Sequence, residues 1–148
     1  MNAPSVASAD TTRLASQLRL GVTRLARKLR QETGSGLTPS LLSALSTIGR
    51  NEPLTLGDLA DAERIRRSSV TRIVAALVEA GLVEREFDAS DRRTTWIRLT
   101  AQGRKLLERS RRRKDAYLAK RLQSLDPREV AALERAVEIF EQLLADGG

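Results

Sequence analysis

The sequence contains no cysteine and no histidine, and these absences exclude several kinds of chemistry. Without cysteine the chain has no disulfide, no thiolate nucleophile and no thiol redox sensor. Without either residue type the common zinc sites are excluded, and so is histidine as the usual general base. No arrangement of the remaining Asp, Glu, Lys, Ser and Tyr residues suggests catalysis. We therefore expect no catalytic site, no metal site and no cofactor.

Long hydrophobic runs are also missing. No uninterrupted apolar segment approaches the roughly 20 residues that a membrane-spanning helix needs. The first residues, MNAPSVASADTT, have neither the charged region nor the apolar region of a signal peptide. We therefore expect no membrane association and a cytoplasmic location.

The composition is that of a folded, basic protein. Of the 148 residues, 41% are hydrophobic and 30% are charged, which fits a globular chain rather than a disordered one. The formal net charge is +7, and the pI is about 10.9. Such a charge suits a polyanionic partner, although a basic surface can also serve solubility alone.

Both ends of the chain are typical of amphipathic helices, because their apolar residues recur at steps of three and four. Two further helices are expected, one starting at Thr38 and Pro39 and one running from Thr100 to about Leu122. A capping-box-like start at Asp126, Pro127 and Glu129 marks the last helix. The apolar residues of the two terminal helices are Leu14, Leu18, Val22, Leu25 and Leu29, and Val130, Leu133, Val137, Phe140 and Leu144.

The two ends differ in charge. Six basic and no acidic residues lie from Arg13 to Arg30, whereas residues 126–146 carry six acidic and two basic residues. These helices could form a bundle within one chain or a dimerisation lobe between two chains. The prevalence of two-fold homo-oligomers favours the lobe, which we assign to residues 10–36 and 104–146. Its expected interface residues are Leu14, Leu18, Leu133, Val137, Phe140 and Leu144.

The middle of the chain predicts a helix-turn-helix. A short helix follows Thr55, the expected N-cap, with Asp58 three residues later. After a polar connection, a second helix at about residues 66–80 ends at Gly81. Its apolar face consists of Val70, Ile73, Val74 and Leu77.

The opposite face of this second helix favours contact with DNA. Ser68 and Arg72 point away from the apolar face, and Thr71 lies on its flank. No acidic residue occurs from Arg64 to Val78. Arg can bind guanine O6 and N7 bidentately, and Ser and Thr can reach bases or phosphates. A merely solvated face is the alternative, but such faces usually mix both signs of charge.

A β-hairpin with an unusual loop comes next. Its strands are expected from Leu82 to Phe87 and from Thr94 to Leu99. The loop, residues 88–93, lacks the Gly of a tight turn and carries Asp91, Arg92 and Arg93. An Arg can enter the narrow, negative minor groove, and Asp91 would hold a neighbouring Arg by a charge-assisted hydrogen bond. The loop is therefore predicted to be a contact.

These elements predict a mainly α fold with a small β-hairpin wing. A winged helix-turn-helix would occupy residues 37–103, and the helical dimerisation lobe would occupy the rest. The alternative function for such a fold is a protein-interaction adaptor that does not bind DNA. The acid-free helix face and the Arg-bearing loop favour a DNA-binding regulator.

Four motifs carry a resemblance to a known family: SSVTR at 68–72, GLVER at 81–85, DRR at 91–93 and LTAQG at 99–103. In this order and spacing, nearly the whole chain resembles the MarR family of bacterial transcriptional regulators. The resemblance implies a homodimer whose protomers each present a winged helix to one half of a pseudo-palindromic operator, with Arg93, or else Arg92, at the wing tip. The residues expected at DNA are Arg66, Arg67, Ser68, Ser69, Thr71, Arg72, Asp91, Arg92 and Arg93.

The chain departs from the family pattern between Ala62 and Arg66, where the small or Gly residue often found at the turn is missing. Relatives often bind aromatic acids or lipophilic phenols between the lobe and the winged helix, so we expect a repressor relieved by a small aromatic or anionic effector. Arg24 and Arg27 are candidates to bind it. Alternatively, they pair with acidic residues of the last helix.

Overall fold

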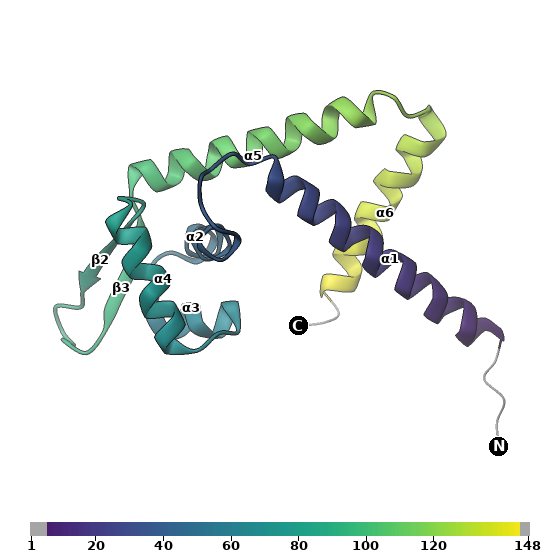
Figure 1. The fold of residues 1–148 in the computed structure, drawn as a ribbon. Coiled ribbons are helices and arrows are strands. Elements are labelled where there is room, and N and C mark those ends of the chain that lie inside the picture. The colour runs from purple at the N-terminus through teal and green to yellow at the C-terminus, as the bar shows by residue number, and fades with distance from the viewer. Residues whose placement is uncertain (1–5, 146–148) are drawn as a thin grey trace, which may run out of the picture.

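A computed structural model describes residues 6–145 of the protein (Figure 1). A winged helix occupies one end of the molecule, and α5 extends from it toward α6. The predicted fold, mainly α with a small sheet, is confirmed. The last residue of the predicted lobe, residue 146, lies outside the described residues. The elements are α1 (Val6–Gln31), α2 (Pro39–Asn51), β1 (Leu54–Thr55), α3 (Leu56–Glu63), α4 (Arg67–Glu79), β2 (Val83–Phe87), β3 (Thr95–Leu99), α5 (Ala101–Leu122) and α6 (Pro127–Ala145).

The predicted helix starts at α2 and α6 are confirmed by their caps. The Asp126 carboxylate accepts the Glu129 backbone N–H at 2.9 Å, and the Glu129 carboxylate accepts the Asp126 N–H at 2.9 Å. At α2 the Thr38 hydroxyl accepts the Leu41 N–H at 3.3 Å. These bonds satisfy amide groups that the first helical turn leaves without a partner. The starts therefore follow from the local sequence.

The hydrophobic core lies inside the winged helix, where α2, α3, α4 and the sheet meet. α4 contributes three side chains that are fully buried, which fixes the rotation of that helix about its own axis. Burial of each such aliphatic side chain is worth about 1.5–3 kcal/mol relative to exposure. The largest fully buried side chains are Leu45, Ile48, Leu59, Val70, Val74, Leu77 and Ile97.

The sheet has three antiparallel strands in the order β1-β3-β2. β2 pairs with β3 over its whole length, so that Phe87 lies opposite Thr95. β1, which the sequence did not predict, places Leu54 opposite Ile97. A two-residue strand is too short to give a periodic pattern, so it is defined only by its partner. It joins the root of the wing to the start of α3.

The turn from α4 to β2 is bonded to the start of α5. Gly81 has a φ of 75°, which permits the sharp exit from α4. The Thr100 hydroxyl donates a 2.6 Å hydrogen bond to the Gly81 carbonyl, and the Thr100 N–H donates one of 3.1 Å to the Leu82 carbonyl. The GLVER and LTAQG motifs are thus two sides of one contact, which fixes α5 to the winged helix.

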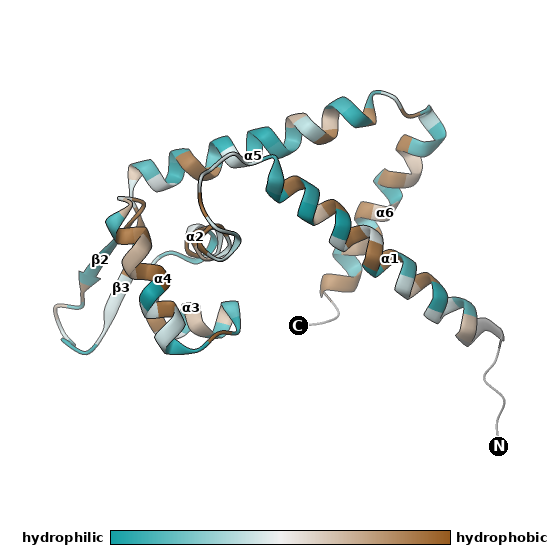
Figure 2. Ribbon diagram, in the orientation of Figure 1, coloured by the Kyte–Doolittle hydropathy of each residue, from teal (hydrophilic) through white to brown (hydrophobic). Residues whose placement is uncertain are grey.

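The apolar faces of α1 and α6 are largely exposed in the single chain. No residue of α6 from Pro127 to Ala145 is buried, and Leu144 is 73% exposed. On α1, Leu14 is 63% exposed. Figure 2 shows the apolar stretches along both helices. This burial pattern does not support the alternative of a bundle within one chain. No helix within residues 6–145 is long and apolar enough to cross a membrane.

Candidate nucleic-acid interface

The helix-turn-helix consists of α3 and α4, joined by residues 64–66. Arg64 adopts the left-handed conformation, with a φ of 53°, and its N–H donates to the Asp61 carbonyl at 3.2 Å. For a residue with a side chain, the left-handed backbone conformation costs about 1–2 kcal/mol relative to the right-handed one. The missing Gly of the turn is therefore replaced by a strained Arg. α4 begins at Arg67, one residue after the predicted start.

A capping box fixes the start of α3, as the sequence predicts. The Thr55 hydroxyl accepts the Asp58 N–H at 3.1 Å, and the Asp58 carboxylate accepts the Thr55 N–H at 3.1 Å. The hydrogen bond from the Thr55 backbone, and then that with its side chain, lower the pKa of Asp58. Asp58 is thus held as a carboxylate that caps the start of α3, where the chain enters the helix from β1.

α4 turns the predicted residues to solvent. Ser68, Thr71 and Arg72 are exposed, whereas Val70 and Val74 are fully buried. The predicted orientation of this face is confirmed; the contact of each residue with DNA stays a prediction. Ser69 is half-buried, and the Thr71 hydroxyl donates to the Arg67 carbonyl at 2.9 Å, so these two are less free than Ser68.

The arginines at the start of α4 have no acidic partner. Arg66, Arg67 and Arg72 are exposed, and none forms an ion pair within residues 6–145. Elsewhere arginines are paired: the guanidinium of Arg104 contacts the Glu52 carboxylate. Unpaired cations along one helix face give a positive field that attracts phosphates.

The wing loop is ordered by two carboxylates. Asp88 accepts the Ser90 N–H at 2.9 Å, the Ser90 hydroxyl at 2.8 Å and the Trp96 indole N–H at 3.2 Å. These bonds, led by that from the Ser90 backbone, lower the pKa of Asp88. Because the carboxylate ties both strands of the hairpin, it braces the base of the loop.

The second carboxylate, Asp91, does not act as predicted. It accepts the Arg93 backbone N–H at 3.0 Å and the Thr94 hydroxyl at 3.3 Å, and no hydrogen bond joins it to an Arg guanidinium within residues 6–145. An Asx-type turn, in which a short carboxylate reaches the backbone two residues on, satisfies it locally. Asp91 therefore supports Arg93 through the backbone, and the Arg92 and Arg93 side chains remain exposed.

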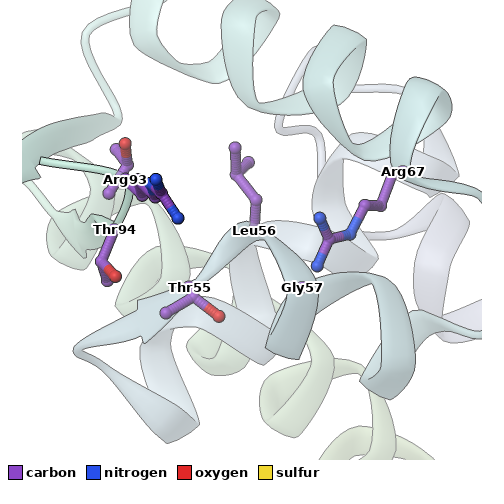
Figure 3. A pocket seen from close by; sticks show the side chains of 7 residues that line it. Thr55, Leu56, Gly57, Arg67, Arg93 and Thr94 are labelled. Carbon is purple, nitrogen blue, oxygen red and sulfur yellow. The ribbon is translucent and has the colours of Figure 1, made fainter. Parts of the chain in front are cut away.

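A hollow of about 250 Å³ separates the start of α4 from the wing. Figure 3 shows the side chains of Arg67 and Arg93 reaching into it from opposite sides, with Leu56 between them. Both arginines were expected at DNA, but the hollow was not predicted, because its walls come from separate segments. The lining residues are Thr55, Leu56, Gly57, Arg67, Arg93, Thr94 and Thr95.

The candidate effector residues lie elsewhere, on α1. Arg24 and Arg27 border an open hollow of about 550 Å³ together with Leu25. Neither forms an ion pair with α6 within residues 6–145. A second hollow, of about 210 Å³, lies where the α1–α2 linker meets α5, and it was not predicted. It is lined by Thr33, Gly34, Ser35, Leu106, Arg109, Ser110 and Arg113.

Comparisons with known proteins agree with this geometry. The MarR family model matches residues 35–94. An uncharacterized helix-turn-helix-type transcriptional regulator of Mycobacterium leprae is 37% identical over 133 residues, which cover 89% of this chain and 93% of that protein. The crystal structure of a putative transcriptional regulator from Pseudomonas aeruginosa is similar, with a TM-score of 0.81 and 31% identity over 91% of this chain and 96% of that one.

A more distant likeness concerns the fold alone. FabT of Streptococcus pneumoniae, solved in complex with DNA, has a TM-score of 0.68 and 20% identity over 93% of this chain and 99% of that chain. The winged helix, the outward α4 face and the near full-length relationship to a transcriptional regulator lead to one conclusion. The chain belongs to the MarR family and is a DNA-binding transcriptional regulator, not an enzyme.

Proposed function

We propose that this regulator is a homodimeric repressor that binds a pseudo-palindromic operator and is released by a small-molecule effector. The observation that carries the proposal is the outward face of α4. Ser68, Thr71 and Arg72 are exposed there, and the helix has no acidic residue before Glu79. FabT, which shares the fold, was solved in complex with DNA, and this supports DNA as the partner.

In the proposed complex the recognition helix, about residues 66–80, enters the major groove with its N-terminus first. The wing, residues 88–93, lies at the adjacent minor groove. The Arg72 guanidinium contacts the edge of a base in the major groove. Ser68 is small enough to let the helix approach the bases closely. Arg66, Ser69 and Thr71 contact the backbone or base edges from the same side. Asp91 keeps the wing in shape without touching a phosphate.

The dimer would form through α1 and α6. Each helix exposes an apolar stripe, which in a monomer would lie in water. Contact between large apolar side chains and water is unfavourable. α1 is basic and α6 acidic, so two copies attract one another across such an interface. The residues proposed at the interface are Leu14, Leu18, Leu133, Val137, Phe140 and Leu144, of which Phe140 is already half-buried.

An anionic or aromatic effector would bind beside the lobe. Arg24 and Arg27 border an apolar-floored hollow and have no acidic partner within the described chain, so they can pair with a carboxylate. An effector there would change how the two winged helices are spaced. Calorimetric titration with salicylate-like anions tests this: binding by the wild type that Arg24→Ala weakens supports it, and absence of binding rejects these residues as the site.

The proposed action is repression, because a dimer bound over a promoter excludes polymerase, and the regulator would work in the cytoplasm beside the chromosome. The operator is sought in the intergenic DNA next to the regulator's own gene, as an inverted repeat with half-sites about one helical turn apart.

A gel-shift titration with that DNA tests the function. Sequence-specific binding in the presence of random competitor DNA, weakening steeply as salt rises, supports the regulator. Reporter expression that falls when the protein is present supports repression. Absent or salt-insensitive binding would favour the alternative, a winged-helix adaptor for another protein.

A further inference from the structure

The linker between α1 and α2, residues 32–38, meets the middle of α5 (Figure 1). Across 80 residues of sequence, Arg113 Nη1 donates a hydrogen bond of 3.0 Å to the Thr33 carbonyl. No other hydrogen bond or ion pair joins this linker to α5 in the part of the chain that the structure describes. Arg113 is exposed, but Thr33 is only 6% exposed, so the bond is partly shielded from water. One side chain of α5 thus holds the start of the linker.

Thr33 is also fixed to the end of α1. Its hydroxyl donates to the Arg30 carbonyl at 2.9 Å, and its N–H donates to the same carbonyl at 3.4 Å. Nearby, the Lys28 ammonium lies 5.8 Å from the centre of the Tyr117 ring of α5, which is a second and weaker contact between the two helices. The bond from Arg113 therefore ties α1, and not the linker alone, to α5.

The other end of α5 belongs to the winged helix, because Leu107 is buried in its core. From Thr33 the chain reaches α2 through Gly34 and Gly36, which have φ values of 56° and 72°, and Leu37 then packs against the same core. Glycines in the left-handed region make a pliable connection. Without the bond from Arg113, the linker would therefore do little to hold the angle between α1 and the winged helix.

The two linker glycines differ in one respect. A Cβ on Gly34 would clash with Arg113 Nη1, whereas a Cβ on Gly36 would meet nothing within 4 Å. Gly34 is therefore the residue that leaves room for the guanidinium. The linker and α5 are complementary at this one point.

The angle of α1 matters for an operator with two half-sites, since α1 carries part of the proposed dimer interface. One extra base pair between half-sites moves one of them by about 3.4 Å and turns it by about 35°. Two winged helices held at one angle can match few separations, whereas loosely held ones can match more. A contact that fixes this angle thus selects the separation.

We propose that Arg113 is a positioning residue whose bond to Thr33 fixes the winged helix relative to α1 and thereby sets the half-site separation that the dimer prefers. Arg113 acts without touching DNA. The inference rests on the proposed homodimer and its pseudo-palindromic operator, and it adds a determinant of specificity that lies outside the DNA-binding face.

The test measures affinity for operators whose half-sites are moved together or apart one base pair at a time. In the wild type, affinity should fall sharply on either side of one separation. In Arg113→Leu, which removes the donor and keeps an apolar stem, this fall should shrink by about 3- to 10-fold, the worth of one hydrogen bond. Arg113→Lys keeps a donor and should restore most of the wild-type profile.

Gly34→Ala attacks the same bond from the linker side and should flatten the profile as Arg113→Leu does. Because the two variants break one contact, the double variant should be no flatter than either. Gly36→Ala is the matched control, since it brings the same left-handed strain without the clash. Arg112→Leu removes the same charge from α5 at a side chain that is 79% exposed. Both controls should keep the wild-type separation profile.

A measurement without DNA follows the angle directly. The chain has no cysteine, so Ser16→Cys on α1 and Ala89→Cys in the wing loop place spin labels at two chosen sites. Labelled chains are diluted in excess unlabelled protein, and dipolar spectroscopy gives the distance distribution within one chain. Arg113→Leu and Gly34→Ala should broaden or shift this distribution, whereas Gly36→Ala should not.

The outcomes separate this inference from the proposed function. If Arg113→Leu and Gly34→Ala bind the operator with the wild-type separation profile, Arg113 is not a positioning residue and the proposed function stands. A loss of affinity that is equal at every separation would also overturn the inference, because it indicates a general loss of folding or charge. If the wild type binds no operator at any separation, the proposed function fails, and the spacing role of Arg113 fails with it.

Discussion

Gly103 lies so close to Leu82 that a Cβ on Gly103 would come within 2.2 Å of the Leu82 carbonyl oxygen. The same carbonyl accepts a hydrogen bond from the Thr100 N–H, so the Leu82 backbone cannot easily move away from Gly103. Gly103→Ala should therefore destabilise the protein by about 1–3 kcal/mol, the usual cost of overpacking. Thermal unfolding measures this loss. Gly21→Ala is the control, since nothing lies within 4 Å of its added methyl group; a wild-type melting temperature for Gly103→Ala would contradict the close contact.

Arg64 holds the turn of the helix-turn-helix in a left-handed conformation. Arg64→Gly should stabilise the fold by about 1 kcal/mol, because Gly adopts this conformation without steric cost. Urea unfolding followed by circular dichroism gives the difference. Arg66→Gly is the matched control: Arg66 has a φ of −70°, where Gly relieves no strain and only loosens the unfolded chain. Equal effects of the two variants would show that strain at Arg64 is not released.

Arg72 separates specific from non-specific binding. Arg72→Ala should cost about 1–3 kcal/mol of operator binding if its guanidinium contacts a base edge. Binding to random DNA should fall much less, since one phosphate contact at most is lost. Fluorescence anisotropy with operator and scrambled duplexes measures both affinities. Arg128→Ala removes the same charge from exposed α6 and should leave both unchanged. An equal loss on both duplexes would place Arg72 at the backbone.

The exposed stripe of α6 tests the dimer. Leu133→Asp or Val137→Asp should give monomers in light scattering and abolish operator binding, because a buried unpaired carboxylate is costly at an interface. Gln142→Asp adds the same charge on the opposite side of α6 and should leave the dimer intact. Dimers that persist in both Leu133→Asp and Val137→Asp would show that another surface joins the protomers.

The base of the wing should be sensitive to acid. The pKa of Asp88 is lowered by hydrogen bonds from Ser90 and Trp96, so its stabilising effect is present above the unfolded value of 3.8 and is lost as pH falls through the lower folded value. Emission of Trp96, the only tryptophan, should stay constant from neutral pH to about pH 4. It should then change as the indole loses its acceptor. In Asp88→Asn this acid step should be missing.

Much of the fold could be predicted from short stretches of sequence. The capping boxes at Thr55 and Asp126 join residues three apart, and the apolar stripe of α4 repeats within a few turns. Such features depend on local hydrogen bonds and on helix geometry, which the order of residues fixes. The outward position of Ser68 and Arg72 follows from the same geometry once the opposite side of α4 is buried.

Other features were missed because they depend on residues far apart in sequence. β1 exists only because Leu54 lies opposite Ile97. Asp91 was expected to bind a guanidinium, but in the closed turn its carboxylate accepts the Arg93 backbone N–H instead. A local pattern cannot rank such competing partners.

The sequence by itself determined the helices, their caps and the side of α4 that carries Ser68 and Arg72, since each is specified within a few residues. Only the tertiary structure decided that Arg67 and Arg93 share one hollow and that Gly103 lies against Leu82. Both relationships arise when the core of α2, α3, α4 and the sheet closes, because packing around that core sets distances between segments that the chain order leaves free.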